Sequence, residues 1–306
     1  MISVIIPTYN RCDRLPKALD AVCAQDVDEL EVIVVDNNSS DATAEVVRNY
    51  PDERVLYTLC TRQGTYQALN HGFALAKGEY LTWTSDDNWY HPGALKDMVQ
   101  VLETTDADFV YSDYVAFDEA TDIGVVVSAP ESSDLDRHCT VGPCFLYHWR
   151  VYDLVGDYSL RYRYAADYDY WLKVRRAGFN MQPMSGSRYT FTYHSGSATR
   201  TRVAVVSAET IRVRLAHGCY PRLWNRPGDP GVAAEGLRHA YCLLRHRYFF
   251  DAVMLAVQAV LHRPLETAFW RRCGQIMRWA IESGRLRMDL RRFFGLKREP
   301  RRPVVL

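Results

Sequence analysis

Two acidic clusters stand where the chain could hold a phosphorylated ligand. Asp36 follows the apolar run Leu30–Val35, and the pair Asp86 and Asp87 follows the apolar run Tyr80–Thr84. Carboxylates repel a phosphate directly, but they hold it through Mg²⁺ or Mn²⁺, which takes oxygen ligands and bridges to a diphosphate. The two clusters therefore predict a nucleoside-diphosphate ligand bound with one of these cations.

Each cluster also has a simpler explanation. Asp, Asn and Ser favour turns for local hydrogen-bonding reasons, so the loop from Asp36 to Asp41 could be only a capping turn. Asp86 and Asp87 could belong to a solvated loop. Other ligand classes have less support, because the sequence contains neither GxGxxG after its first apolar run nor GxxxxGK[ST]. Its eight cysteines form no CxxC and no His pair has zinc spacing, which disfavours disulfide scaffolds and zinc sites.

Apolar runs that alternate with helical patterns would position these clusters. The runs predict strands over residues 3–6, 30–35, 54–59, 80–84 and 108–117. Strands that alternate with helices of this length indicate an α/β fold with a doubly wound, mainly parallel sheet flanked by helices. In such a sheet ligands bind beyond the carboxyl ends of the strands, which is where both acidic clusters fall.

The second half of the chain is less regular. A helix is expected over Tyr164–Ala177 and an edge strand over Arg188–His194. The turn-rich stretch Trp224–Gly231 predicts a boundary, so we expect a catalytic domain over 1–220 and a small helical extension over 221–306.

The extension is basic. From Arg238 to the end it contains 15 Lys and Arg against 5 Asp and Glu, which predicts contact with phosphates or an anionic membrane, although a solvated helical face would have the same composition. The N-terminus does not have the pattern of a signal peptide, and no apolar run reaches the ~20 residues of a membrane span. We expect a cytoplasmic protein with no nucleic-acid partner, and peripheral contact at the inner face of the membrane is the alternative to a solvated helical face.

Four motifs carry a family resemblance. In order along the chain they are Ser3-Val-Ile-Ile-Pro-Thr-Tyr-Asn-Arg11, Val34-Val-Asp-Asn-Asn-Ser-Ser-Asp41, Gly78-Glu-Tyr-Leu-Thr-Trp-Thr-Ser-Asp-Asp-Asn-Trp-Tyr-His-Pro92 and Ala166-Asp-Tyr-Asp-Tyr-Trp-Leu-Lys-Val-Arg-Arg-Ala-Gly178. They resemble the successive signatures of family-2 glycosyltransferases, which have the GT-A fold and act with inversion. The resemblance covers roughly residues 1–200.

The resemblance implies a donor site. Pro7, Thr8, Tyr9 and Arg11 would line the nucleotide pocket, and Asp36 would accept a hydrogen bond from the base. Asp86 would face the ribose. Asn70 and Arg200 would be further donor-binding residues, with Arg200 on a flexible loop where it neutralises the leaving diphosphate.

The resemblance also implies a metal site and a general base. Asp87 would bind Mn²⁺ or Mg²⁺, together with His194 from the segment Tyr193–Arg200. Asp167 would take the proton of the acceptor hydroxyl, and Asp169 would be structural. Simpler roles remain: a surface carboxylate for Asp167 and a satisfied polar side chain for His194.

Several positions depart from the common family pattern. Ser85 and Asn88 replace acidic residues beside the metal motif, Leu69 stands where an arginine is usual, and Ala166 stands where a glutamate precedes the base. These departures keep open a non-catalytic nucleotide-sugar-binding protein. A sugar-1-phosphate nucleotidyltransferase is a further alternative, although the glycine-rich phosphate loop that it requires is absent.

The predicted function is transfer of a hexose or deoxyhexose from a nucleoside-diphosphate sugar to a saccharide or lipid-linked acceptor. The resemblance places it in the synthesis of cell-surface polysaccharide or glycolipid. A UDP- or dTDP-linked donor is favoured, because Asp36 and Thr8 would address the imide N–H and a carbonyl of a pyrimidine.

Overall fold

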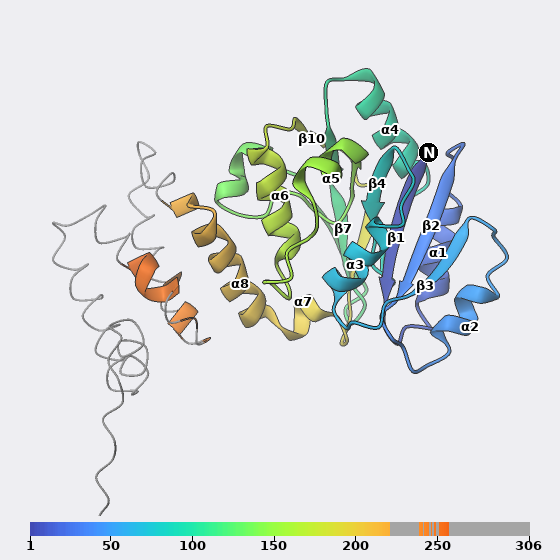
Figure 1. Cartoon of the computed structure of the whole chain (residues 1–306), viewed down its shortest axis with the longest axis horizontal. Coiled ribbons are helices and arrows are strands. Elements are labelled where there is room, and N and C mark those ends of the chain that lie inside the picture. The colour runs from blue at the N-terminus through green and yellow to red at the C-terminus, as the bar shows by residue number, and fades with distance from the viewer. Residues whose placement is uncertain (221–238, 241, 245, 247, 249–250, 257–306) are drawn as a thin grey trace, which may run out of the picture. The chain divides into compact units, whose positions relative to one another are not determined.

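The computed structural model describes residues 1–220, 239, 240, 242–244, 246, 248 and 251–256 (Figure 1). The chain divides into two compact units, Met1–Glu209 and Thr210–Leu306. In the second unit, residues 239, 240, 242–244 and 251–256 are helical. The remaining parts of the predicted C-terminal helices lie outside the described residues. No helix in the described part of the chain has the length and hydrophobicity needed to cross a bilayer.

The central layer of the first unit is a seven-stranded sheet within the described residues. In spatial order its strands are β10 (Met181–Met184), β6 (Phe109–Ser112), β9 (Phe145–His148), β4 (Tyr80–Trp83), β1 (Ile2–Thr8), β2 (Leu30–Asp36) and β3 (Val55–Leu59). All neighbouring strands are parallel except β9, which runs antiparallel to both β4 and β6. The expected mainly parallel sheet is confirmed.

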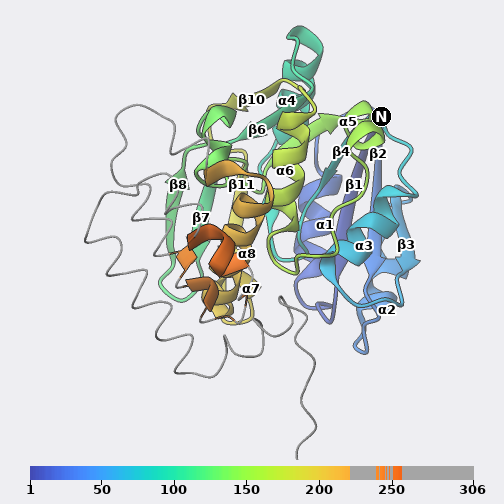
Figure 2. The same cartoon turned by 60° about the vertical axis from the view of Figure 1, so that its left-hand side comes forward.

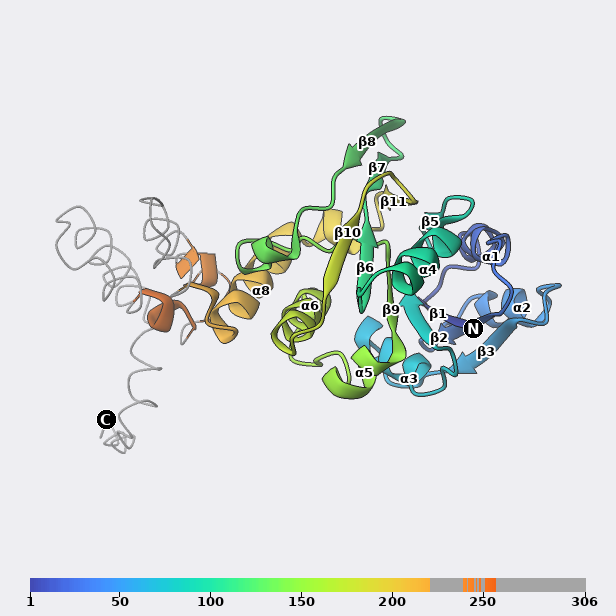
Figure 3. The same ribbon diagram turned by 90° about the horizontal axis from the view of Figure 1, so that it is seen from above.

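Helices cover both faces of this sheet (Figure 3). In chain order these helices are α1 (Leu15–Cys23), α2 (Thr43–Arg48), α3 (Thr65–Phe73), α4 (Ala94–Thr104), α5 (Trp149–Val155) and α6 (Ala166–Arg176). The 3-10 helix η1 (Ser132–Asp136) precedes α5. Alternate residues of β1 point to opposite faces. Val4 and Ile6 join a core with α1 and α4, whereas Ile5 faces α3. There Gly72 allows close packing, because a Cβ on it would lie 2.6 Å from Ile5.

A four-stranded sheet lies beside the seven-stranded sheet and close to two further helices (Figure 2). Its order is β5 (Trp89–Tyr90), β11 (Tyr189–Tyr193), β7 (Tyr114–Asp118) and β8 (Ile123–Val127), and the helices are α7 (Ala198–Thr201) and α8 (Val203–Ala216). β11 runs parallel to β7, while β5 and β8 pair antiparallel at the two edges. Because β7 and β11 run parallel, the small sheet brings together the two segments that follow these strands.

The single strand expected over residues 108–117 is wrong, because the chain changes sheets at Asp113. β6 ends at Ser112 in the large sheet and β7 begins at Tyr114 in the small one. The Asp113 carboxylate makes this break possible, since it accepts hydrogen bonds from the backbone N–H of Ala129 at 2.7 Å and of Gly186 at 2.8 Å. Two backbone donors that the sheets leave unpaired are thereby satisfied.

Candidate active site

The carboxyl ends of β1 and β2 form the floor of the site. Asp36, the last residue of β2, is buried, and its carboxylate accepts hydrogen bonds from the Ser39 N–H at 2.8 Å and the Tyr57 hydroxyl at 2.9 Å. A carboxylate oxygen has a second lone pair, so a ligand N–H can still bind there. The Asn37 N–H donates to the Thr8 carbonyl at 2.8 Å, which ties the two strand ends together.

Two residues at the end of β1 have side chains suited to a ligand. The Thr8 hydroxyl is buried and interacts with the Asp86 carboxylate, where it opposes the increase in pKa that burial causes. A hydroxyl that donates to a carboxylate keeps lone pairs with which it can accept a hydrogen bond from a bound molecule. Tyr9, which follows at once, is 48% exposed and can offer its ring to a base or sugar.

The acidic pair follows β4, and its two carboxylates have different surroundings. Asp86 is buried, with 8% of its surface exposed. Burial and the nearby charge of Asp87 raise the pKa of Asp86 to about 7, and the Thr8 hydroxyl and the Arg11 guanidinium oppose this effect. Asp86 therefore lies near the end of β1, close enough to Arg11 for their charges to interact. The Asp87 side chain has a different partner.

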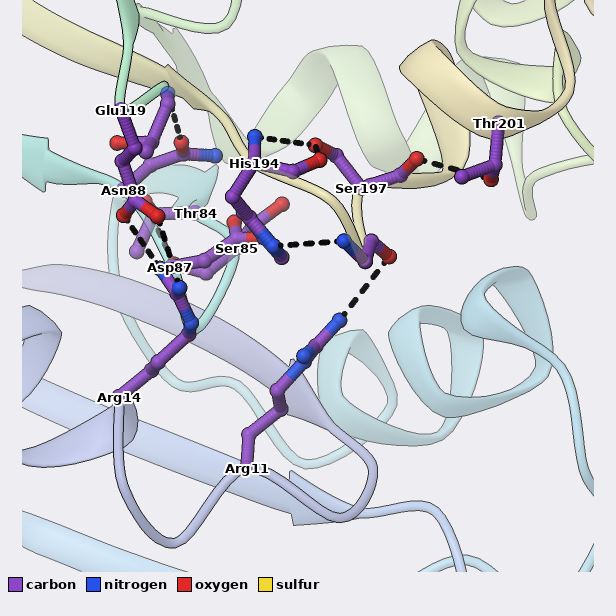
Figure 4. Close-up of polar contacts among 12 residues, drawn as sticks. Arg11, Arg14, Thr84, Ser85, Asp87, Asn88, Glu119, His194, Ser197 and Thr201 are labelled. Carbon is purple, nitrogen blue, oxygen red and sulfur yellow. Dashed lines mark hydrogen bonds and ion pairs between the residues drawn. The ribbon is translucent and has the colours of Figure 1, made fainter. Parts of the chain in front are cut away.

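Asp87 points to His194, which follows β11 (Figure 4). Nε2 of His194 lies 2.9 Å from Oδ2 of Asp87. Nδ1 of the same ring accepts the backbone N–H of Gly196 at 3.1 Å, so in neutral imidazole the proton is on Nε2 and faces Asp87. Arg11 reaches the same turn, since its guanidinium donates to the Gly196 carbonyl at 3.3 Å.

The Asp87–His194 pair fits a divalent cation. Oδ2 of Asp87 and Nε2 of His194 lie 2.9 Å apart, and carboxylate oxygens and imidazole nitrogens are groups that would hold a divalent cation. A bound ion would take the place of the Nε2 proton, as metal binding to imidazole requires. The described residues contain no group of three or more His, Cys, Asp or Glu side chains placed for a metal. The other ligands would therefore come from the diphosphate and water.

Arg14 and Glu119 border the acidic pair. The guanidinium of Arg14 donates to both carboxylate oxygens of Glu119, at 2.6 and 2.9 Å, and it lies close to Asp87 (Figure 4). Together with Asn88 and Trp89, these residues line a cleft of about 290 Å³. Neither Arg14 nor Glu119 was predicted from the sequence. Glu119 could have been predicted, because Asp118 and Glu119 form a third acidic cluster at the end of a strand.

Asp167 is the second residue of α6, and the groups of other elements that surround its carboxylate form what we call the Asp167 pocket. Its carboxylate accepts the N–H of Tyr168 at 2.8 Å, and its backbone N–H lies 3.4 Å from the Tyr66 hydroxyl. Burial raises the pKa of Asp167, and hydrogen bonds from Tyr168 and Tyr66 oppose the increase. A helix N-terminus favours an ionised carboxylate, but removal from water has the larger effect on Asp167.

Further ionisable groups face the same pocket, from separate elements. They are Cys139 before β9, Tyr158 after α5 and Glu209 in α8. Asp169, by contrast, pairs with Lys173 one helical turn on, at 2.7 Å. The Asp169 carboxylate is thus paired with Lys173, an ion pair within α6 that is consistent with the structural role expected for Asp169.

Comparison with known proteins identifies the family. A family model described as "Glycosyl transferase family 2" matches residues 3–166. The chain belongs to glycosyl transferase family 2. A mycobacterial "PGL/p-HBAD biosynthesis glycosyltransferase", from Mycobacterium bovis, is 31% identical over 179 residues, covering 56% of this chain and 68% of the relative. An uncharacterised glycosyltransferase of Rickettsia typhi is 28% identical over 188 residues, or 58% of this chain, and the match spans only 59% of that relative's length.

Solved structures place this family 2 chain among GT-A folds. Staphylococcus aureus TarS, residues 1–349 in complex with UDP-GlcNAc, superposes with a TM-score of 0.58 at 20% identity, over 81% of this chain and 73% of TarS. The mannosyltransferase PcManGT of Pyrobaculum calidifontis, in complex with GDP-Man and Mn²⁺, gives 0.58 at 18% identity, over 92% of this chain and 80% of that one. At such identities the likeness concerns the fold.

Two predicted donor-binding residues of this glycosyltransferase have other partners. The Asn70 amide donates to the Tyr158 carbonyl and accepts the Tyr158 N–H, both at 2.9 Å. Arg200 lies in α7 rather than on a loop, and its guanidinium pairs with Asp118 at 2.9 Å. The structure thus brings Thr8, Asp86, Asp87 and His194 together at the strand ends, whereas Asn70 is engaged beside the Asp167 pocket.

Proposed function

We propose that this chain is an inverting glycosyltransferase that moves a sugar from a nucleoside-diphosphate sugar to an acceptor hydroxyl. The observation that carries the proposal is the contact between Asp87 and His194 at the strand ends, a pair that fits a divalent cation. Mn²⁺ or Mg²⁺ held there would offset the charge of the leaving diphosphate. The PcManGT complex with GDP-Man and Mn²⁺ supports this assignment.

The donor would lie across the ends of β1 and β2. Thr8 offers a buried hydroxyl with spare acceptor capacity, Tyr9 an exposed ring and Asp36 a carboxylate with spare acceptor capacity. Pro7 fixes the strand end that precedes them, and Asp86 faces the ribose. A pyrimidine donor, UDP- or dTDP-linked, fits an acceptor carboxylate beside a hydroxyl. The TarS complex with UDP-GlcNAc supports a donor of this class.

Asp167 would take the proton from the acceptor hydroxyl as it attacks the anomeric carbon. Direct displacement needs one carboxylate on the acceptor side, away from the leaving diphosphate. Asp87 cannot fill this role, because its carboxylate faces His194. A pKa raised by burial brings Asp167 nearer to operating pH, which strengthens it as a base once ionised.

The biological setting that we propose follows the relatives. The name of the mycobacterial relative refers to PGL/p-HBAD biosynthesis, which supports a role in making cell-surface glycolipid or polysaccharide, with a hexose or deoxyhexose transferred. We place the reaction in the cytoplasm, at the inner face of the membrane. Apolar residues of the basic extension that would add to membrane contact, Phe249, Phe250, Trp270 and Trp279, lie outside the described residues.

The test offers UDP-, dTDP- and GDP-sugars with hydroxyl acceptors and measures release of nucleoside diphosphate, with NMR of the anomeric carbon. Release with inverted configuration is expected. Nucleotide binding without turnover would instead favour the non-catalytic binding protein, for which Leu69, Ser85 and Ala166 are the motivating residues. A parallel assay with a nucleoside triphosphate and a sugar-1-phosphate covers the other alternative, and release of pyrophosphate there would favour the sugar-1-phosphate nucleotidyltransferase.

A further inference from the structure

A second cleft lies on the small sheet, apart from the Asp87–His194 pair. It has a volume of about 440 Å³ and is lined by Asp118, Tyr193, Arg200, Val203, Val206 and Ser207. Asp118 and Tyr193 are the paired last residues of β7 and β11. The other four residues come from α7 and the first turns of α8, which run beside these strand ends (Figure 2).

The cleft is bounded by segments that continue into the proposed chemistry. Tyr193 directly precedes His194, the partner of Asp87. Val206 is one helical turn from Glu209, and residues three apart on a helix are surface neighbours. Glu209 accepts the Tyr164 N–H at 2.7 Å, three residues before Asp167, and together with burial its charge raises the pKa of Asp167. The cleft is therefore lined by segments that also carry a residue of the metal pair and a neighbour of the base.

One wall of the cleft is polar. Arg200 and Asp118 form an exposed ion pair at 2.9 Å, which can exchange partners with sugar hydroxyls because exposed pairs contribute little stability. Tyr193 lines the cleft, and its hydroxyl makes no hydrogen bond within the described residues, so it can donate to a ligand. An aromatic ring beside charged and hydroxyl groups suits the apolar face and the polar rim of a pyranose.

The other wall is apolar and continues onto the sheet surface. Val203 is 60% exposed at the cleft edge. In the small sheet Ile123 pairs with Asp118, and Val125 lies two residues further along the same face. These two side chains are 57% and 58% exposed. A strip of exposed β-branched residues beside a polar cleft calls for a ligand that is polar at one end and apolar at the other.

We propose that this cleft binds the acceptor, and that the acceptor is a saccharide with an apolar alkyl or aryl aglycone. The sugar lies between Tyr193 and the Arg200–Asp118 pair, and the aglycone lies along Val203 and Ile123. This assignment rests on the proposed function, which it extends by naming the acceptor class. A free saccharide would leave the apolar strip in water, and a flat membrane surface would not need a cleft lined by an ion pair.

The experiment uses the full chain with n-octyl β-D-glucopyranoside, its galactose and mannose analogues and the three free sugars, below micelle-forming concentrations. Binding is measured by saturation-transfer NMR competition for the wild type, Val203→Asp and Tyr193→Ala. The matched control is Leu56→Asp, because Leu56 is a similarly exposed apolar residue, 46% exposed, on the edge strand β3 of the other sheet. Affinity for UDP is measured in parallel.

At least one octyl glycoside should bind the wild type, and Val203→Asp should weaken that binding about tenfold, as expected when the apolar contact of a valine is replaced by a charge. Leu56→Asp should leave it unchanged, and all variants should retain UDP affinity. Equal binding by wild type and Val203→Asp, tight binding of a free sugar, or no binding of any octyl glycoside would overturn the cleft assignment. If the wild type does not bind UDP, that result would count against the proposed function and not against the cleft assignment.

Discussion

Nε2 of His194 lies 2.9 Å from Oδ2 of Asp87, although 107 positions separate the two residues. The contact joins the loop after β4 to the turn after β11, which Arg11 also holds through the Gly196 carbonyl. Strands of two different sheets are therefore connected where the donor diphosphate would lie. Both the loop and the turn contribute one side chain to the proposed metal site.

The metal effect on nucleotide binding should depend on this pair. We expect Mn²⁺ and Mg²⁺ to tighten UDP binding by the wild type, and Asp87→Ala or His194→Ala to reduce that effect about ten- to a hundredfold. Titration calorimetry with and without EDTA measures it. Asp26→Ala is the control, because Asp26 pairs with Lys96 at the surface. If EDTA leaves both affinity and turnover of the wild type unchanged, the metal assignment is wrong.

The pH dependence should report Asp167. Its ionised form accepts the proton, and burial raises its pKa. The kcat/KM should therefore fall as the pH drops through this raised pKa, at a higher pH than for an ordinary aspartate. The Tyr66 hydroxyl stabilises the ionised form, so Tyr66→Phe should raise the pKa further and move the acidic limb to higher pH.

Tyr152→Phe is the matched control for that profile, since it also removes a tyrosine hydroxyl that donates to an aspartate, at 2.6 Å to Asp157. Its acidic limb should coincide with that of the wild type. If the acidic limb of the kcat/KM profile stays in place or moves to lower pH in Tyr66→Phe, the Tyr66 hydroxyl does not stabilise the ionised form of Asp167.

Asn70 should act on stability rather than on the donor. Its amide makes two hydrogen bonds to the backbone of Tyr158, so Asn70→Ala should lower the free energy of unfolding by about 2 kcal/mol at roughly 1 kcal/mol for each bond. Chemical denaturation measures this change. A normal unfolding free energy together with weakened UDP binding would restore the donor-binding role predicted from the sequence.

The nucleotide base should be a pyrimidine. Asp36 has acceptor capacity and pairs across the sheet with Thr8, whose side chain has a hydroxyl, an arrangement that suits the imide N–H and carbonyl of uracil or thymine. Calorimetry with UDP, dTDP, GDP and ADP is expected to rank the two pyrimidines first. Tightest binding of GDP or ADP would contradict the preference.

Much of the fold could be predicted, because a buried parallel strand is a nearly continuous apolar run. β1, β2 and β4 were identified in this way, and with them the strand ends that carry Asp36, Asp86 and Asp87. The change of sheet at Asp113 could not be predicted, because β-forming residues continue on both sides of it. β8 and β9 were missed for the related reason that short strands outside the alternating pattern give little periodic signal.

Side-chain partners across the sheets were harder to predict than strands. The sequence gives no local sign that Arg14 reaches Glu119 or that Asn70 reaches the Tyr158 backbone, because such contacts depend on loop packing rather than on hydrophobic period. Asp167 was predicted from the resemblance, whereas its pocket came from four separate segments. Its raised pKa follows from that enclosure, which no local motif encodes.

Turnover of Asp167→Asn tests the central claim most directly. The substitution keeps the shape of the side chain but cannot take a proton, so release of nucleoside diphosphate in the presence of acceptor should fall by about 10²–10⁴-fold while UDP affinity changes little. Asp169→Asn, two residues on and paired with Lys173, should keep most of the activity. Near-normal turnover by Asp167→Asn together with loss of activity in a folded Asp169→Asn would contradict the assignment of the base.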